Sequence, residues 1–185
     1  YRNENADLEP RVEGNRLYNR RGEAVLLTGV NCSSLEWMCN PDKLVRTVQV
    51  ALDDWHANTI RLPLSQDKWF GFGGDQRGED ESGERYRAMV DKIVEEVAAR
   101  KKYVILDLHR SNCGSWGEFI SGNMPDMNSL VFWKNIALRF KNHPNVLFGI
   151  FNEPFKVSWE CWRDGGEVTV EYAPQNVGNQ IMRDE

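Results

Sequence analysis

A regular alternation of short apolar strands with amphipathic helices is the feature that most constrains the fold of this 185-residue chain. Apolar residues at helical spacing predict helices over residues 40–55, 82–100 and 129–141, with a further helical stretch from Asn176. We predict that strands begin near Val25, Asn58, Tyr103 and Asn145. Strands and helices that alternate at this pace are typical of parallel βαβ units.

Three local signals set the expected boundaries of these elements. A polar turn at residues 19–22 predicts a β-hairpin over residues 12–27. Asn40 is expected to cap the first helix, with Pro41 at its first position. Pro63 is expected to end the second strand, because proline has no N–H to donate to a strand ladder.

Two architectures are built from repeated βαβ units, and the glycine pattern separates them. A doubly wound nucleotide-binding sheet needs a GxGxxG turn after its first strand, whereas this chain has Gly29-Val30-Asn31-Cys32-Ser33 there. We therefore predict an α/β fold that forms part of a (β/α)8 TIM barrel. Because barrel chemistry lies at the C-terminal strand ends, five polar residues become candidates: Asn31, Arg61, His109, Asn152 and Glu153.

The strand spacing indicates how much of a barrel the chain supplies. Successive strand starts lie 33, 45 and 42 residues apart, so eight strands would need roughly 300 residues. We expect the first half of a barrel, with four parallel strands, preceded by a short β-hairpin and interrupted in the helix after the fourth strand. The first and fourth strands of such a half barrel would have unpaired edges that invite association.

Composition argues against several partners and cofactors. The formal net charge is −5, whereas nucleic-acid binding needs a basic face. No apolar run approaches the ~18 residues of a membrane span, and the first ten residues do not have the build of a signal peptide. We expect no metal or other cofactor, since the three dispersed histidines and four cysteines match no zinc-site spacing. Disulfides among Cys32, Cys39, Cys113 and Cys161 stay open.

Three short motifs at successive strand ends carry a resemblance to a known family. They are Arg61-Leu62-Pro63 closing the second strand, Leu106-Asp107-Leu108-His109 closing the third, and Phe151-Asn152-Glu153-Pro154 closing the fourth. In this order they resemble the motifs of glycoside hydrolase family 5, the cellulase-like retaining glycosidases. The resemblance covers nearly all of residues 12–185, including the stretch GNRLYNRRGEAVLLTGVN.

The resemblance implies a role for each motif residue. Glu153 would be the general acid and base, which protonates the leaving glycosidic oxygen and then deprotonates the attacking water. Asn152 would hydrogen-bond the 2-hydroxyl of the sugar, and His109 would bind at the subsite of cleavage. Arg61 would hold the nucleophile ionised, although pairing with Asp107 is an alternative role. The family's nucleophile, a second Glu after the seventh strand, has no counterpart here.

The residue types also make chemical sense without the family. Cleavage of an acetal with retained configuration needs one carboxyl that gives a proton and one carboxylate about 5 to 5.5 Å away that attacks the anomeric carbon. Pleat alternation places Arg61, Asp107 with His109, and Glu153 on strand faces that point into the barrel mouth. Four other acids lie on loops at this end but do not end a strand opposite Glu153: Glu36, Asp67, Glu118 and Glu160.

Tryptophans give a second signal for a carbohydrate cleft. Trp55 and Trp133 fall on helical stripes and are expected in the core. Five others fall on loops at the catalytic end, where flat rings can stack on sugar rings. Apart from Trp162, we expect them to bind substrate, although packing within a loop is an equal alternative for any single one: Trp37, Trp69, Trp116 and Trp159.

These patterns predict a partial catalytic domain over residues 12–185, preceded by an N-terminal extension over residues 1–11. We expect the parent enzyme to hydrolyse cellulose or a related β-glucan, and to be secreted because such polymers do not enter cells. Its expected partners are the oligo- or polysaccharide and the missing C-terminal half of the barrel, so the isolated chain should be inactive. Two alternatives stay open, a non-catalytic carbohydrate-binding half barrel and a barrel completed by two copies of the chain.

Overall fold

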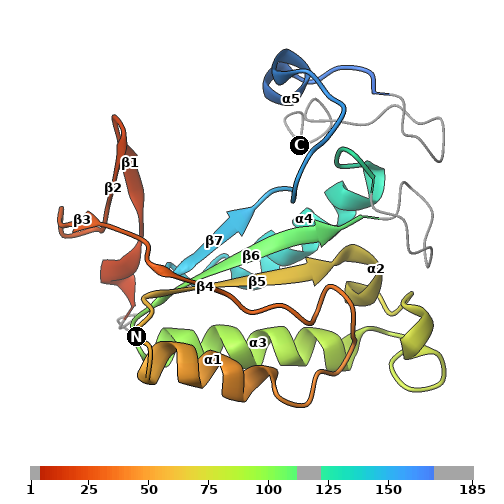
Figure 1. Cartoon of the computed structure of the whole chain (residues 1–185), viewed down its shortest axis with the longest axis horizontal. Coiled ribbons are helices and arrows are strands. Elements are labelled where there is room, and N and C mark those ends of the chain that lie inside the picture. Colours follow the sequence, from red (N-terminus) through yellow and green to blue (C-terminus); the bar gives the residue numbers. More distant parts are fainter. Residues whose placement is uncertain (1–4, 112–121, 169–185) are drawn as a thin grey trace.

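The computed structural model describes residues 5–111 and 122–168, which form two sheets (Figure 1). One sheet is antiparallel, in the order β1 (Arg11–Glu13), β2 (Arg16–Tyr18) and β3 (Ala24–Val25). The other is parallel, in the order β4 (Gly29–Asn31), β5 (Thr59–Ser65), β6 (Tyr103–Arg110) and β7 (Val146–Gly149). The parallel sheet follows the chain order, as the first half of a barrel requires.

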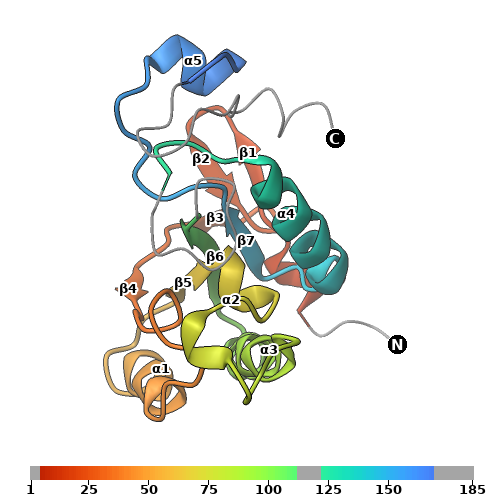
Figure 2. The ribbon, with the colours of Figure 1, turned by 90° about the vertical axis from the view of Figure 1, so that its right-hand side faces the viewer.

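Three long helices lie along the outer face of the parallel sheet. They are α1 (Leu44–Asp53), α3 (Glu84–Ala99) and α4 (Met127–Phe140), and each joins the end of one strand to the start of the next (Figure 2). Their apolar stripes pack against alternate residues of the central strands, including Ile60, Leu62 and Leu64 of β5 and Val104, Leu106 and Leu108 of β6. The residues between these, such as Arg61 and Asp107, therefore lie on the inner face.

The antiparallel sheet has one more strand than predicted. β1 and β2 are joined at Gly14, whose φ of 61° suits a tight turn, and the predicted turn at residues 19–22 joins β2 to β3. A short 3-10 helix, η1 (Ala6–Leu8), precedes β1. The Arg20 backbone N–H donates to the Asp7 carbonyl at 3.1 Å, which ties this N-terminal segment to the sheet.

Helix boundaries agree well for α3 and α4, but the predicted start of α1 is wrong. Asn40 and Pro41 do not begin the helix, because residues 40–43 form a bend and a turn instead of a first helical turn. The N-cap residue is Lys43, whose side chain makes no capping hydrogen bond. α4 begins with a capping box, which was not among the predicted boundary signals. The Asp126 carboxylate accepts from the Ser129 N–H at 2.9 Å, and the Ser129 hydroxyl accepts from the Asp126 N–H at 3.0 Å.

The expectation that Pro63 ends its strand is also wrong, since β5 continues to Ser65. The Arg61 carbonyl accepts from the Cys32 N–H at 2.9 Å, so the backbone polar groups of Arg61 point toward β4. The backbone of Pro63, two residues later, points to the same side. β4 has already ended at Asn31, opposite Arg61. The sheet therefore needs no donor where proline lacks one.

Two tryptophans lie in environments opposite to those predicted. α1 ends at Asp53, so its apolar stripe does not reach Trp55, which is 69% exposed. Trp69 ends the short helix α2 (Gln66–Trp69), which begins directly after β5 and carries the indole into the core. The Trp69 ring is fully buried against Tyr86 and Phe132, so the expectation that it binds substrate is wrong.

Short elements complete the described chain. η2 (Gly74–Gln76) lies in the loop before α3, and α5 (Trp159–Asp164) lies in the Trp-rich segment after β7 that was expected to be a loop. Trp133 is buried, as predicted. The helical stretch predicted from Asn176 lies outside the described residues.

Candidate active site

A buried carboxylate connects two neighbouring strands at the C-terminal end of the parallel sheet. The Asp107 side chain is 3% exposed, and its Oδ2 accepts from Arg61 Nη2 at 2.7 Å. The same oxygen lies 2.9 Å from His109 Nδ1. Because a carboxylate only accepts, this contact places the imidazole proton on Nδ1 and leaves Nε2 as an acceptor.

The Arg61 guanidinium extends this pair into a network. Its Nη1 donates to Asn31 Oδ1 at 2.9 Å, and its Nη2 also donates to Asn152 Oδ1 at 2.7 Å. Asn152 Nδ2 lies 3.4 Å from His109 Nε2, the nitrogen that is free to accept. Side chains from β4, β5 and β6 and from the segment after β7 are thus brought together, as the strand-end argument predicted. The pairing of Arg61 with Asp107, which the sequence offered as an alternative role, is confirmed.

Glu153 follows this network on a segment beyond the last strand. β7 ends at Gly149, so the prediction that pleat alternation orients Glu153 is wrong. The Asn152 N–H donates to the Leu108 carbonyl of β6 at 2.9 Å, which fixes the segment where it leaves the sheet. Glu153 itself has a φ of 49°, a backbone conformation that non-glycine residues rarely adopt and that concentrates at functional sites.

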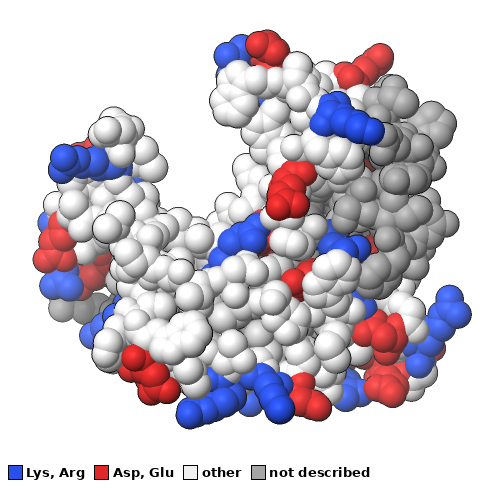
Figure 3. Space-filling view, viewed as in Figure 1, with Lys and Arg blue, Asp and Glu red and all other residues white. Residues whose placement is uncertain are grey.

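A pocket of about 290 Å³ brings Glu153 together with two members of the network. Its lining residues are Trp37, His109, Arg110, Gly122, Asn152, Glu153 and Phe155. In the part of the chain that the structure describes, Glu153 is the one carboxylate in this lining. Figure 3 shows that this face of the molecule is hollowed between the antiparallel sheet and α5, with charged side chains at the floor of the hollow.

The tryptophans predicted to bind substrate have different outcomes. Trp37 lines the pocket and is 48% exposed. Trp159, at the start of α5, is 68% exposed but does not line this pocket. Trp116 lies outside the described residues. Trp69 is in the core.

Sequence reasoning missed Arg110 as a member of the pocket. Strict alternation along β6 places Arg110 on the opposite face from His109. The register of β5 and β6 shifts at this point: Leu64 pairs with Leu108, and Ser65 then pairs with Arg110. A bulge of this kind re-aims side chains and left no signal in the sequence.

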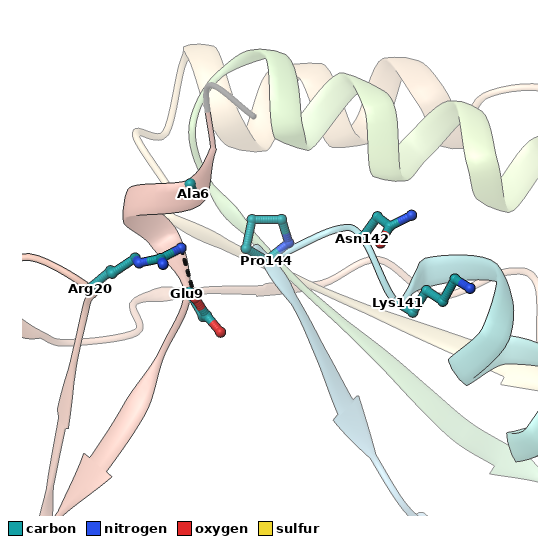
Figure 4. Close-up of a pocket in the computed structure, with 6 residues that line it drawn as sticks. All are labelled: Ala6, Glu9, Arg20, Lys141, Asn142 and Pro144. Carbon is teal, nitrogen blue, oxygen red and sulfur yellow. Dashed lines mark ion pairs between the residues drawn. The ribbon is translucent and has the colours of Figure 1, made fainter. Parts of the chain in front are cut away.

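A second hollow lies at the opposite end of the parallel strands. Figure 4 shows its lining, which comes from the N-terminal segment, the turn between β2 and β3, and the turn between α4 and β7: Ala6, Glu9, Arg20, Lys141, Asn142 and Pro144. Glu9 and Arg20 form an ion pair at 3.3 Å, and both side chains are more than half exposed. Since barrel chemistry occurs at the C-terminal strand ends, this hollow is not the candidate active site.

No group of three or more His, Cys, Asp or Glu side chains within residues 5–111 and 122–168 is arranged to hold a metal ion. Among the helices formed by these residues, none has the length and apolar character needed to span a membrane.

The parallel sheet, its outer helices and its polar strand ends define the chain as half of a (β/α)8 barrel with its candidate site at the C-terminal end. Residues 18–182 match the family model described as cellulase (glycosyl hydrolase family 5). The chain therefore belongs to glycosyl hydrolase family 5.

Characterised proteins of this kind are similar to the chain over most of its length. Endoglucanase A of Butyrivibrio fibrisolvens is 28% identical over 144 residues, which cover 77% of this chain and 31% of that protein. Endoglucanase MaCel5A of Microbulbifer sp. is 28% identical over 151 residues, which cover 81% of this chain and 27% of that protein. The chain thus spans about a third or less of these relatives.

Solved structures agree with the half-barrel interpretation. The catalytic domain of Thermobifida fusca endoglucanase Cel5A superposes with a TM-score of 0.60 at 26% identity, covering 86% of this chain and 47% of that domain. A variant of the same enzyme, solved with cellotetraose, has a TM-score of 0.57 at 27% identity, covering 82% of this chain and 45% of that one. The chain therefore corresponds to a little under half of each domain.

Proposed function

We propose that the enzyme to which this chain contributes hydrolyses the O-glycosidic bonds of a β-linked glucan, with Glu153 as its general acid and base. The observation that supports this proposal is the shared pocket, where Glu153 lies with His109 and Asn152. The endoglucanase names of the relatives support a glucan as substrate, and the cellotetraose complex supports an oligosaccharide ligand.

We propose complementary tasks for the other side chains of the network. The Asn152 carbonyl oxygen is held by Arg61 and its Nδ2 lies 3.4 Å from His109 Nε2, so the second N–H of the amide is the one left to donate to a sugar hydroxyl. His109 is fixed by Asp107 with Nε2 as its accepting atom. Asn31 is held by Arg61 and lines the same strand ends. These side chains would orient the sugar while the exposed Glu153 carboxyl reaches the glycosidic oxygen.

Retention of configuration requires a second carboxylate, which attacks the anomeric carbon before water does. We propose that it comes from the remaining half of the barrel, as the family resemblance implies, and that Arg61 helps to keep it ionised. Under this proposal the isolated chain does not turn over substrate. We also propose that residues 12–185 belong to the catalytic domain and residues 1–11 precede it. Secretion is supported by a relative named major extracellular endoglucanase, from Xanthomonas campestris.

The test compares the longer protein that contains this chain with its Glu153→Gln variant. We expect kcat on carboxymethylcellulose to fall by about 10²- to 10⁴-fold, the usual contribution of general acid–base catalysis. For an aryl cellobioside whose leaving group needs no proton, kcat/KM, which reports the first step, should fall much less, whereas kcat should still fall because the second step lacks its base. The matched control is Glu160→Gln, an exposed acid in α5, which should keep full activity.

Two results would contradict the proposal. If activity survives Glu153→Gln, Glu153 is not the general acid. If the 185-residue chain alone releases reducing sugar at a robust rate, the proposal that the nucleophile lies outside this chain is wrong. If neither the wild-type nor the variant form of the longer protein hydrolyses substrate but both bind cellotetraose equally, the function is carbohydrate binding without catalysis.

A further inference from the structure

The bulge in β6 places two consecutive side chains in the same pocket. Because Ser65 pairs with Arg110 directly after Leu64 pairs with Leu108, His109 is an extra residue in the ladder. His109 keeps its contact with Asp107, and Arg110, the next residue, lines the pocket beside it. A cation is therefore added to the wall without displacing the histidine.

The Arg110 guanidinium, at the end of β6, lies over the indole ring of Trp37, in the loop after β4. Its Cζ is 3.4 Å from the centre of the Trp37 ring, well within the roughly 6 Å limit for a cation–π contact. Trp37 remains 48% exposed and lines the pocket, so part of this residue is open to a ligand there.

The backbone that carries Trp37 is fixed by buried groups on its N-terminal side. The Leu35 carbonyl accepts from the Tyr86 hydroxyl at 2.8 Å, and the Glu36 carboxylate, on a residue that is 2% exposed, accepts from the Ser34 N–H at 2.7 Å. These contacts locate the loop but do not set the rotamer of the indole. Burial lowers the pKa of Arg110. The negative charge of the Glu36 carboxylate acts in the opposite direction, because it favours the charged guanidinium.

We propose that Arg110 is a positioning residue for carbohydrate binding, which holds the Trp37 indole against the pocket wall so that the opposite face of the ring stacks on a pyranose. The inference rests on the proposed function and adds to it the residue that orients the platform. A planar guanidinium can stack on an indole, whereas a lysine ammonium supplies only a point charge. A lysine at position 110 should therefore hold the Trp37 ring less well than arginine does.

The experiment uses the 185-residue chain labelled with 5-fluorotryptophan, at a concentration where light scattering finds a single species. Trp37→Phe assigns the Trp37 resonance in the fluorine NMR spectrum. In Arg110→Met we expect that resonance to shift or broaden while those of the buried Trp69 and Trp133 stay in place, which reports a folded chain. Arg110→Lys should disturb the resonance less than Arg110→Met, because it keeps the charge and loses only the planar stack.

Calorimetry on the same samples measures the affinity for cellotetraose, and so tests whether the orientation of Trp37 affects sugar binding. We expect Arg110→Met to weaken binding by about five- to tenfold, as the loss of one oriented aromatic contact implies. The matched control is Arg20→Met, at the opposite end of the sheet, which should change neither the Trp37 resonance nor the affinity.

The outcomes separate this inference from the proposed function. An unchanged Trp37 resonance in Arg110→Met would overturn the positioning role. A shifted resonance with unchanged affinity would overturn the link to sugar binding. If the wild-type chain binds no cellotetraose, Trp37 is not a sugar platform in this chain and that part of the proposed function fails, while the fluorine spectra still decide whether Arg110 orients the ring.

Discussion

The Asp107 carboxylate lies beneath the Arg61 guanidinium, which donates to it across neighbouring strands at 2.7 Å. Asp107 is 3% exposed and Arg61 is 32% exposed, so the ion pair runs from the interior of the sheet to the floor of the site. From there Arg61 reaches Asn31 and Asn152. The polar side chains of the candidate site are thus held by Arg61, whose charge is balanced by a carboxylate that is shielded from water.

We expect Asp107→Asn to lower the free energy of unfolding by about 2 kcal/mol. Removal of one partner of a buried ion pair leaves the other charge poorly compensated, and the cost stays below the full buried value because Arg61 is partly solvated. Urea denaturation followed by circular dichroism measures the change. Asp164→Asn is the control, since its pair with Arg163 is more than half exposed and should contribute less than about 0.5 kcal/mol. Equal stabilities of the two variants would contradict this account of Asp107.

Gly149→Ala should disturb the same carboxylate from the next strand. A Cβ at Gly149 would lie 2.8 Å from Asp107 Oδ1, closer than carbon and oxygen tolerate, so the side chain or the strand must shift. We expect a loss of about 1 to 3 kcal/mol in the free energy of unfolding, the usual range for an overpacked buried site.

A matched alanine substitution separates this clash from a general effect of glycine. A Cβ at Gly74 would meet no atom within 4 Å, so Gly74→Ala should change the free energy of unfolding by less than about 0.5 kcal/mol. Thermal unfolding of both variants checks the comparison. If Gly149→Ala is as stable as wild type, the strand yields easily and Asp107 is not tightly confined.

The parts of the fold that the sequence predicted well are those that local periodicity determines. The buried face of α3, from Tyr86 to Val97, repeats at helical spacing and packs as that spacing requires. The strand-end residues Arg61, His109 and Asn152 meet because parallel strands bring their C-terminal ends to one edge. Neither result depends on details of the loops.

The misses come from features that local pattern does not encode. Trp69 is buried because α2 follows β5 without a loop. The sequence around Trp69 gave no indication of this short helix. The inward position of Arg110 depends on a bulge, which reverses the expectation from alternation. Pro63 is accepted inside β5 because β4 is short, which is a property of the neighbouring strand.

A buried lysine gives the molecule a pH-dependent contact. The Lys68 side chain is 2% exposed and pairs with Asp75, which also accepts from the Cys39 N–H at 2.9 Å. Burial raises the pKa of Asp75, but the hydrogen bond from Lys68, together with that from Cys39, outweighs it and leaves the pKa below the ordinary value of 3.8. Asp75, in the loop before α3, is thereby joined to α2 through Lys68 and to the loop after β4 through Cys39.

The sign of the pH effect follows from this lowered pKa. The contribution of Asp75 to stability is complete above pH 3.8 and is lost as the pH falls through the lower value in the folded chain. Wild type should therefore lose stability on acidification more steeply than Asp75→Asn, and the two free energies of unfolding should converge at low pH. Urea denaturation across this pH range measures the convergence. Parallel curves, or a neutral Asp75→Asn at pH 7, would contradict it, and Glu79→Gln, in an exposed pair, serves as control.

The open edge of the half barrel should make the isolated chain associate. In the part of the chain that the structure describes, β4 and β7 each pair on one side only. The apolar side chains of Leu138, in the helix α4 that leads into β7, and of Ile150, directly after β7, are 68% and 50% exposed. Because an unpaired strand with apolar neighbours is a template for another chain, we expect the mass measured by light scattering to rise with concentration.

Leu138→Lys combined with Ile150→Lys should suppress this association, since charged side chains beside an open edge oppose pairing. Val12→Lys, at a site that is 73% exposed on the antiparallel sheet, is the control and should leave the association unchanged. A barrel completed by two copies would instead give a mass that levels off at twice 21.4 kDa. Monomers at every concentration would show that the edge is protected in a way that the four-stranded sheet does not explain.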